Sequence, residues 1–599
     1  MRKLRQKALS SWRVIQRANS LLLANKRYRR IFILSFIVSC FLNQGWLLSS
    51  WSFSQITNKL AGQATIFASV PLVIAVLFNI AANIVPRTLS YRIQKFDLRF
   101  RRISGEEIER LYWKSYAKFG LQDRENHKLQ DALDDASRNQ NAAIDIFYIQ
   151  QRLALAIITV IISGITLATI RWWYFFIIVA TVVPRMYFTW KRKTRNYKQQ
   201  KRLNEVNRYK NTLSNYVSTK EAILNGSRDH YLDLFDSLRA RLNSFLYSAD
   251  EHFASISYWG DMWFYSISGG LFLLIALQVY HHQLLIGSMF IVFSCTAAMY
   301  QRLDQATTAL IDLQIGTKKA DDFFLILDTV PAIQNAVDAI EIDDTKTPRI
   351  EFDNVYFKYP GSEQYVLKGV SFSIEAGESV GLIAKNGEGK TTIALLLLRF
   401  YDPTEGSIRV NGIDLRLIQC ESLLAITGAL FQDFATLKTT IRGAILATRP
   451  GYKCSDFQMW QILERVGLKD YVEKLPKTIN QKVDRIFKDS VKLSGGQNQK
   501  LGLAGLILRD PKFVLLDEFT SALDPEAEKN IIEQYKQIIQ NKTALIISHR
   551  YMSLKIVDRI IVLHEGKIVE SGKKEDLMVI NDGIFHKLYK AAEFATSLN

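Results

Sequence analysis

Long apolar stretches dominate the first half of the chain, and short alternating stretches dominate the second half. Six apolar runs have the length that a membrane-spanning helix needs, which is roughly 20 residues. They cover residues 31–49, 65–85, 153–170, 172–190, 262–280 and 284–300. From Ile350 onward the pattern changes to short alternating strands, Gly/Pro turns and amphipathic helices, which is typical of a soluble α/β domain.

Positive charge is concentrated beside the apolar runs. Residues 1–30 carry ten Lys or Arg, and residues 191–202 carry seven. The short links between paired runs are nearly free of such charge, with Lys59 in the first link and none in 281–283. The positive-inside rule therefore places the N-terminus, the two long polar connectors and the C-terminal half in the cytoplasm. Buried helices of a large soluble protein, the alternative interpretation, do not require this consistent charge pattern.

The remaining bulk properties exclude several classes of protein. The net charge of +19 flanks the apolar runs and is accompanied by no groove-reading module, so we expect no nucleic-acid partner. Four scattered cysteines without a CxxC spacing indicate neither a disulfide framework nor a zinc site. The charged stretch before the first run is too long for a signal peptide, so we expect it to be retained. Its residues 9–25 are expected to form an amphipathic helix on the membrane surface.

A glycine-rich segment stands between an apolar strand at 379–383 and an apolar helix. It reads Lys385-Asn-Gly-Glu-Gly-Lys-Thr-Thr, the order of a phosphate-binding P-loop. Gly387 and Gly389 would let backbone N–H groups approach the phosphates of ATP at a helix N-terminus. Lys390 would reach the β- and γ-phosphates, and Thr391 would offer its hydroxyl to Mg²⁺.

Two residues depart from the general P-loop pattern. Ala384 stands where the first glycine is usual, and Glu388 adds a negative charge where phosphates must sit, unless its side chain points outward. The other members of the segment, Lys385, Asn386 and Thr392, are expected to contact the nucleotide as well.

A second apolar strand, residues 512–516, ends in two adjacent carboxylates. Asp517 would hold Mg²⁺ through water, and Glu518 would polarise the water that attacks ATP. Either acid alone is also what a core strand with a solvated end presents. Together with the P-loop, the pair predicts ATP hydrolysis with Mg²⁺.

Between these two motifs stands the pentapeptide Leu493-Ser-Gly-Gly-Gln. Together with Gln432 after a phenylalanine, Ser521-Ala-Leu-Asp after the second strand, and His549 in Ile547-Ser-His-Arg, it closely resembles the nucleotide-binding domain of ABC transporters. The apolar runs and long cytoplasmic connectors ahead of it resemble the membrane domain of ABC exporters. The resemblance therefore covers essentially the whole chain.

The resemblance implies roles that no single residue would reveal. Tyr359 would stack on the adenine of ATP, and His549 would contact the γ-phosphate. Gln432 would link Mg²⁺ and the attacking water to the membrane domain. The resemblance also implies short helices near the tips of the two connectors, around residues 119–126 and 227–234, that dock on the ATPase domain near Gln432.

The resemblance further implies a partner. Ser494 and Gly496, with their neighbours Gly495 and Gln497, would bind the γ-phosphate of an ATP molecule held by the opposite subunit, and Asp524 would lie at the dimer junction. One chain then carries two half-sites that cannot close on each other. We therefore expect a second copy of the chain, or a paralogous half-transporter, as its partner.

The expected fold class is multidomain: an all-α transmembrane domain with six membrane helices, followed by an α/β P-loop ATPase domain. The expected boundaries are a basic cytoplasmic segment at 1–30, the membrane domain at 31–330, a linker at 331–349 and the nucleotide-binding domain at 350–599. The chain is expected to be an integral membrane protein of a bacterial cell membrane, in contact with lipid, with its ATPase domain in the cytoplasm.

The cargo rests on resemblance alone. Phe431-Gln-Asp-Phe and the compact chain resemble lantibiotic exporters of the nisin type, so the main expectation is export of a modified peptide. No leader-cleaving protease domain is expected before the first run. Export of drugs or lipids is the alternative, and an ATP-gated channel or regulator is a third. The few ionisable residues in or near the runs, Arg171, Arg185 and Asp261, do not decide among these cargoes.

Overall fold

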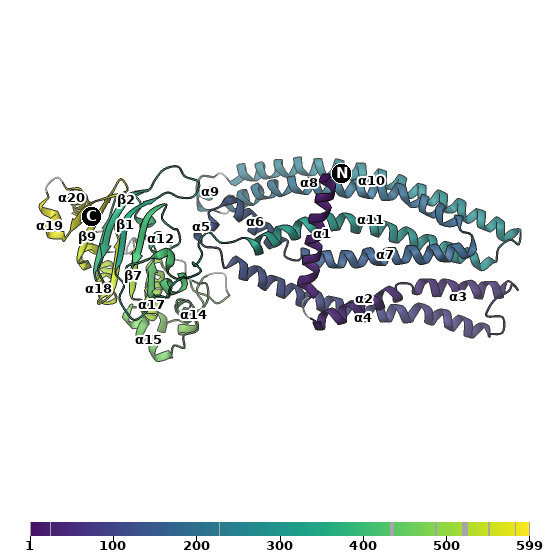
Figure 1. Ribbon diagram of the computed structural model, residues 1–599, viewed down its shortest axis with the longest axis horizontal. Helices are drawn as coiled ribbons and strands as arrows, with labels where there is room; N and C mark the ends of the chain where they lie inside the picture. Colours follow the sequence, from purple (N-terminus) through teal and green to yellow (C-terminus); the bar gives the residue numbers. More distant parts are fainter. Residues whose placement is uncertain are drawn as a thin grey trace. The chain divides into compact units, whose positions relative to one another are not determined.

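The structure of this protein, a computed structural model (Figure 1), describes residues 2–23, 26–217, 219–226, 228–431, 437–484, 488–517, 525–548, 551–580 and 583–597. The chain divides into two compact units. The helical unit comprises Met1–Ala117 and Asp131–Thr329, and the sheet unit comprises Lys118–Gln130 and Val330–Asn599. The sheet unit therefore includes a short excursion from the first long connector.

Long helices build the helical unit, and the N-terminal helix crosses several of them (Figure 1). The helices of this part of the chain are α1 (Arg2–Leu23), α2 (Lys26–Leu42), α3 (Gly45–Leu60), α4 (Leu72–Tyr116), α6 (His127–Arg138), α7 (Ala142–Ile170), α8 (Trp173–Val217), α9 (Lys220–Leu224), α10 (Arg228–Tyr280) and α11 (Ile286–Asp328). The two polar connectors are thus mostly helical continuations of the apolar runs.

Within the described residues, four helices are long and apolar enough to cross a membrane. They are Leu72–Tyr116, Ala142–Ile170, Trp173–Arg195 and Tyr258–Tyr280. These helices contain most or all of the second to fifth runs expected from the sequence. The sixth run lies in α11, in which Arg302 and Asp304 follow the apolar segment closely.

The first two expected runs differ from the observed helices at their ends. The first is divided between α2 and α3, because the chain turns at Asn43 and Gln44, whose side chains bond to Ser39 O (2.8 Å) and Thr159 Oγ1 (3.0 Å). The second begins only after Pro71, which stands at the N-terminal end of α4. Pro lacks a backbone N–H and favours such a position at the start of a helix.

Helix α1 is tied to two of the helices it crosses. Arg17 donates two hydrogen bonds to Asp328 at the end of α11, at 2.5 and 2.6 Å, and Asn19 bonds to Gln150 of α7 at 3.1 Å. The bonds from Arg17 lower the pKa of Asp328. The described part of the helix expected at 9–25 is therefore helical, as part of α1, and polar contacts join it to α7 and to the end of α11.

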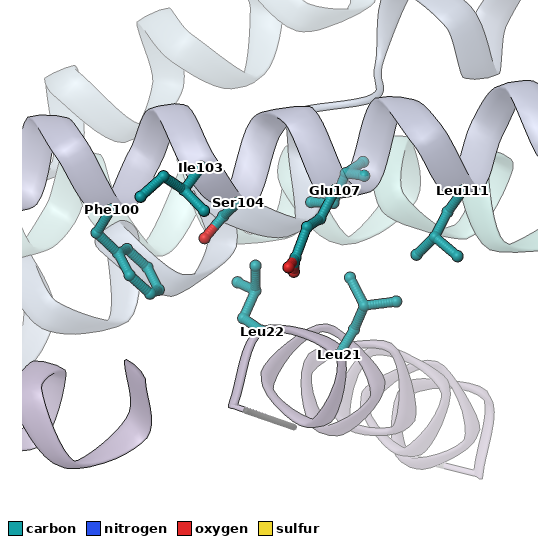
Figure 2. A pocket seen from close by; sticks show the side chains of 8 residues that line it. Leu21, Leu22, Phe100, Ile103, Ser104, Glu107 and Leu111 are labelled. Carbon is teal, nitrogen blue, oxygen red and sulfur yellow. The ribbon is translucent and has the colours of Figure 1, made fainter. Parts of the chain in front are cut away.

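A small cavity of about 40 Å³ lies between α1 and α4 (Figure 2). Leu21 and Leu22 line it from α1, and Phe100 and Leu111 are among the lining residues from α4, with the carboxylate of Glu107 turned toward α1. The cavity has room for about one water molecule. Figure 2 shows the lining side chains of this small cavity, which come from both helices.

Charged residues on three of the long helices meet in one cluster. Arg185 of α8 forms ion pairs with Asp261 of α10 and with Asp304 of α11, the latter at 3.4 Å. Tyr300 donates a hydrogen bond to Asp261 at 2.8 Å, and the Arg185 guanidinium lies 4.6 Å from the centre of the Tyr300 ring. Charges within apolar segments are costly unless paired, so this cluster holds α8, α10 and α11 in register.

The sheet unit contains the short helix of the first connector and all of the strands. Its elements are α5 (Leu121–Arg124), β1 (Ile350–Phe357), β2 (Leu367–Ile374), β3 (Ser379–Ile383), α12 (Lys390–Leu397), β4 (Glu405–Val410), β5 (Ile413–Asp414), η1 (Leu415–Leu417), α13 (Cys420–Ile426), β6 (Thr427–Leu430), α14 (Ile441–Leu446), α15 (Asp456–Arg465), α16 (Lys469–Glu473), η2 (Thr478–Asn480), α17 (Gly495–Arg509), β7 (Phe513–Asp517), α18 (Pro525–Ile539), β8 (Thr543–Ile547), η3 (Tyr551–Ile556), β9 (Arg559–His564), β10 (Lys567–Gly572), α19 (Lys574–Val579) and α20 (Ile584–Ser597).

Two sheets form the sheet unit. One has the order β2-β1-β4-β5 and is antiparallel; the other has the order β10-β9-β3-β8-β7-β6. In the second sheet every neighbouring pair except β9 and β10 is parallel. Strands β3, β7 and β8 are buried along their whole length, which is the pattern of strands covered on both faces.

The segment expected to be a linker is held against the sheet unit. Ile340 exchanges backbone hydrogen bonds with its neighbours, donating to Leu417 O at 2.7 Å and accepting from Gln419 N at 3.0 Å. The guanidinium of Arg399, which is buried, donates to Gln334 O at 3.0 Å. Part of this segment is therefore anchored to the folded domain, which limits its freedom.

The close contact between α3 and α11 predicts a stability difference between two glycines. A Cβ added to Gly287 would lie 2.7 Å from Asn58 Oδ1 and in contact with Ser54, whereas one added to Gly270 of α10 meets nothing within 4 Å. We expect Gly287→Ala to destabilise the protein by about 1–3 kcal/mol through overpacking. Gly270→Ala is the matched control and should leave the thermal unfolding temperature of the detergent-purified chain unchanged or raised. Equal unfolding temperatures for both variants would contradict this packing.

Candidate functional site

Strand register brings the predicted motifs to one edge of the parallel sheet. Strand β8 pairs with β3 on one side and with β7 on the other, with Ile547 opposite both Leu382 and Asp517. All three strands run in the same direction, so the residues that follow them leave the same edge. In sheets of this kind ligands bind at the carboxyl ends of the strands.

The glycine-rich segment forms a tight loop between β3 and α12. Gly387 and Gly389 have positive φ values of 83° and 105°, which side chains rarely tolerate. Gly389 also faces β2, because an added Cβ would lie 2.9 Å from Leu367 and 3.0 Å from Val366. Ala384 is buried and is not among the described residues with positive φ. Its methyl group therefore fits where a glycine is usual.

Lys390 lies over this loop. Its Nζ donates to Ala384 O at 2.8 Å, to Lys385 O at 3.4 Å and to Asn386 Oδ1 at 3.4 Å, and its side chain is buried. An ammonium group has three donors and is a compact point charge. Phosphate oxygens entering the loop would compete for the same hydrogens.

The structure places a hydroxyl and a carboxylate together beside the loop. Thr391 Oγ1 donates to Asp517 Oδ2 at 3.4 Å, and Asp517 is buried at the end of β7. Oxygen ligands of this type suit Mg²⁺, which is bound by one or two protein groups together with phosphates and water. The donor set therefore fits the expected metal ion.

Tyr359 lies against the same helix. Its hydroxyl forms a 2.9 Å hydrogen bond with Thr392 Oγ1, and its ring meets that of Tyr401 edge-on at 5.4 Å. Tyr359 is only partly buried, so part of its ring stays available to an adenine. The hydroxyl of Thr392, which was expected to contact the nucleotide, is therefore bonded to Tyr359 in this structure.

Tyr401 connects this site to the first connector, a link that the sequence did not reveal. Its ring is buried, and burial followed by the neighbouring carboxylate of Glu125 raises the pKa of its hydroxyl. Glu125 follows α5 directly. Asp123 of α5 accepts hydrogen bonds from Gly120 N and, across the chain, from Ala332 N, both at 3.0 Å. The expected docking of residues 119–126 therefore has a concrete set of contacts.

The second segment expected to dock on the ATPase domain, residues 227–234, differs from the first because it belongs to the helical unit. Within 227–234, the structure describes the first residues of α10, and the nearby short helix is α9 (Lys220–Leu224). Both belong to the helical unit. Gln432, the expected centre of the docking surface, lies outside the described residues.

The pentapeptide motif begins a helix. Ser494 is the N-cap of α17, with Gln497 N donating to Ser494 Oγ at 3.2 Å and Ser494 N donating to Gln497 Oε1 at 2.9 Å. This reciprocal capping box fixes the start of the helix. Ser494 and Gly495 are exposed, and Gly496 is partly exposed. A helix N-terminus presented in this way suits an anion.

The other predicted catalytic residues, Glu518 and His549, and the predicted junction residue Asp524 also lie outside the described residues. Their neighbours do not. Asp517 and Ile547 end adjacent strands, and Ser548 N donates to Leu382 O of β3 at 3.4 Å. The chain therefore leaves the sheet beside the glycine-rich loop immediately before both positions that are predicted to be catalytic.

The chain is similar to several known proteins. Residues 367–521 match the family model described as ABC transporter. The chain is 33% identical over 305 residues to the ATP-dependent lipid A-core flippase of Shewanella frigidimarina, covering 51% of this chain and 50% of that protein. It is 34% identical over 312 residues to the flippase of the same description from Haemophilus ducreyi, with 52% of each covered.

Two further similarities are more distant or cover less. ABC transporter B family member 21 of Arabidopsis thaliana is 30% identical over 308 residues, which are 51% of this chain and 23% of that protein. The solved structure of a bacterial Atm1-family ABC exporter with ATP bound aligns with a TM-score of 0.78 at 20% identity, over 95% of this chain and 99% of that one.

These comparisons establish the fold of the chain and show that the sheet unit contains an ABC transporter domain. The chain spans about half the length of the curated relatives it matches. Its fold, a helical membrane domain followed by an α/β nucleotide-binding domain, is that of the Atm1-family exporter. Four of the described helices are long and apolar enough to cross a membrane, which supports an integral membrane protein, and the family match assigns ATP binding to the sheet unit.

The geometry of the loop predicts that two exchanges between alanine and glycine affect the affinity for MgATP to different extents. Ala384→Gly should change the affinity for MgATP by less than about twofold, because the backbone at Ala384 does not need glycine. Gly389→Ala should weaken it about tenfold or more, because the left-handed backbone and the contact with Leu367 add roughly 1–3 kcal/mol of strain. Equilibrium nucleotide binding to the purified full chain measures both. A large loss for Ala384→Gly would contradict the observed loop.

Proposed function

We propose that this chain is an ATP-driven half-transporter that moves an amphipathic, lipid-like or hydrophobic substrate out of the cytoplasm. The observation that carries the ATPase part is the meeting of Thr391 with Asp517 beside the glycine-rich loop. The family match over residues 367–521 supports the same reading. The long connectors and the strongly basic N-terminus support a cytoplasmic nucleotide-binding domain.

Each residue of the site has a definite task in this proposal. Backbone N–H groups at the start of α12 and the Lys390 ammonium bind the phosphates, and Tyr359 stacks on the adenine. Thr391 and Asp517 would hold Mg²⁺, which when bound neutralises phosphate charge in the transition state. Glu518, the residue after Asp517, orients and polarises the attacking water, with His549 and Gln432 completing the γ-phosphate side.

The proposal includes a second subunit. The exposed N-terminus of α17, with Ser494, Gly495, Gly496 and Gln497, would face an ATP molecule bound by a partner, and Asp524 would lie at that junction. Both kinds of half-site are present in one chain. A homodimer in a bacterial cell membrane is the simplest assembly, and a paralogous half-transporter is the other.

The contacts of α5 supply a path by which ATP binding could act on the membrane helices. Thr392 in the phosphate-binding helix bonds to Tyr359, which packs on Tyr401, which in turn lies beside Glu125 of the first connector. If nucleotide binding displaced α12, these contacts would transmit the displacement to α5. Such contiguous packing supports coupling when one of its elements has two arrangements.

The lipid-like cargo is supported by the descriptions of the relatives. The two bacterial relatives described above are lipid A-core flippases, and the plant relative is an ABC transporter of the B family. None of these three descriptions names a peptide. Export of a modified peptide, the main expectation from the resemblance to nisin-type exporters, is therefore the second candidate.

Replacing Glu518 separates binding from hydrolysis. We expect Glu518→Gln to lower the steady-state ATPase rate at least about a hundredfold, because the water loses its base, while MgATP affinity stays close to that of the wild type. Lys390→Ala is the companion variant and should lose binding as well. Phosphate release and nucleotide binding by the chain in lipid nanodiscs measure the two properties. Wild-type turnover in Glu518→Gln would exclude the base role.

Transport assays distinguish the cargo classes. In inside-out vesicles containing the purified chain alone, we expect ATP-dependent movement of a fluorescently labelled phospholipid or uptake of a hydrophobic dye, abolished by Lys390→Ala. A labelled cationic modified peptide serves as the competing probe. Peptide uptake without lipid or dye transport would replace the lipid-like cargo by the peptide. Transport that persists down a gradient with a nonhydrolysable nucleotide would indicate a gated channel instead.

A further inference from the structure

A negative side chain within the phosphate-binding loop has a specific partner. Glu388 Oε1 lies 2.9 Å from His564 Nδ1, and Glu388 Oε2 accepts a hydrogen bond from Lys385 N at 3.3 Å. A carboxylate only accepts hydrogen bonds, so Nδ1 of the histidine carries the hydrogen. Both carboxylate oxygens of Glu388 are thus occupied, and its side chain is only 15% exposed.

This contact turns the Glu388 carboxylate toward β9. Thr391 and Asp517, the expected ligands of Mg²⁺, lie on the other side of β3. In the sheet order, β9 lies on one side of β3, and β8 and β7 lie on the other. His564 ends β9, whereas Asp517, with its bonded Thr391, ends β7. The carboxylate is therefore held on the opposite side from the place where Mg²⁺ and the terminal phosphates would sit.

The position of His564 is set by the surrounding structure. Strand β9 pairs in parallel with β3, with Val562 opposite Ile383, so the end of β9 lies beside the start of the loop. The turn after β9 is locked to β2, because Gly566 O accepts from Lys368 N at 2.8 Å and an added Cβ at Gly566 would lie 2.5 Å from Val366 O.

The same short stretch of chain supports both partners. Val366 and Leu367 limit the space at Gly389 in the glycine-rich loop, and Val366 also limits it at Gly566 in the turn after His564. The loop and the turn after His564 therefore pack against the same residues, Val366 and Leu367. This shared packing keeps the side chains of Glu388 and His564 at hydrogen-bonding distance.

We propose that His564 is a positioning residue for nucleotide binding: it holds the Glu388 carboxylate away from the phosphate-binding face of the loop. The inference rests on the proposed ATP site. Without its partner, the carboxylate would be free to rotate toward the phosphates, where like charges repel. This chain thereby tolerates an acidic residue where the phosphates must sit, and His564 and Glu388 act as a pair.

A double-mutant cycle on the full chain in nanodiscs tests the pair, with MgATP as the probe. His564→Ala should raise the Kd for MgATP about tenfold, the change expected for a full charge moved close to a polyphosphate in a partly aqueous site. Glu388→Gln should bind at least as tightly as wild type. The double variant His564→Ala/Glu388→Gln should match Glu388→Gln alone, because no charge then remains to be held.

Three controls keep the result interpretable. His564→Gln, which retains a side-chain donor, should bind MgATP much more tightly than His564→Ala. His586→Ala removes a partly buried histidine that bonds to Met578 O in the same unit and should not change the Kd. Gel filtration and thermal unfolding report whether each variant is folded, and saturating-ATP turnover of folded His564→Ala should stay near wild type.

The outcomes separate the two proposals. An equal loss of affinity for His564→Ala in the wild-type and Glu388→Gln backgrounds would show a merely structural role and overturn the inference, as would an unchanged Kd in His564→Ala. Either result would leave the proposed ATP site standing if Lys390→Ala still abolishes binding. Failure of the wild-type chain itself to bind MgATP above the level of Lys390→Ala would overturn both.

Discussion

The parallel pairing of β3, β8 and β7 is the constraint on which the rest of the nucleotide site depends. Each strand is buried along its whole length, so a slip in register would expose apolar residues or leave backbone groups unpaired. With the register held, the loop after β3 and the carboxylate that ends β7 meet at one edge. The 3.4 Å contact between Thr391 and Asp517 follows from this pairing and from the helix that begins at Lys390.

The order of the strands decides on which side of the loop each charged group lies. The Lys390 ammonium is held over the loop by carbonyl and amide oxygens, while the Thr391 hydroxyl and the Asp517 carboxylate lie toward β7. The one acidic side chain within the loop, Glu388, is drawn to the β9 side. Electrostatic interactions are strong in such partly buried surroundings, so the direction of a single carboxylate matters to an anionic ligand.

Aromatic packing and two carboxylates connect the loop to the first connector. Tyr359 and Tyr401 fill the space between the phosphate-binding helix and the segment around α5, and Asp123 fastens that segment to the start of the C-terminal unit. In the helical unit, Arg185 joins three apolar helices through Asp261 and Asp304. In an apolar environment polar contacts of this kind are the specific ones, because hydrophobic surface alone does not distinguish a helix from lipid.

The sequence by itself determined the two-part architecture, the glycine-rich loop and the strand that ends in Asp517, because apolar length and strand–loop–helix order are local properties. The pattern also predicted the helix α1, whereas the short connector helix α5 was expected only from the resemblance to ABC exporters. It also extended the first two apolar runs across Asn43 and Pro71, since a hydropathy pattern does not register a turn whose polar side chains are satisfied by neighbouring helices. Only the tertiary structure decided that Ala384 fits its position, that Arg185 meets two aspartates, and that Glu388 turns toward His564. Those outcomes depend on backbone dihedrals and on contacts between residues far apart in the chain, about which the spacing of one sequence carries no signal.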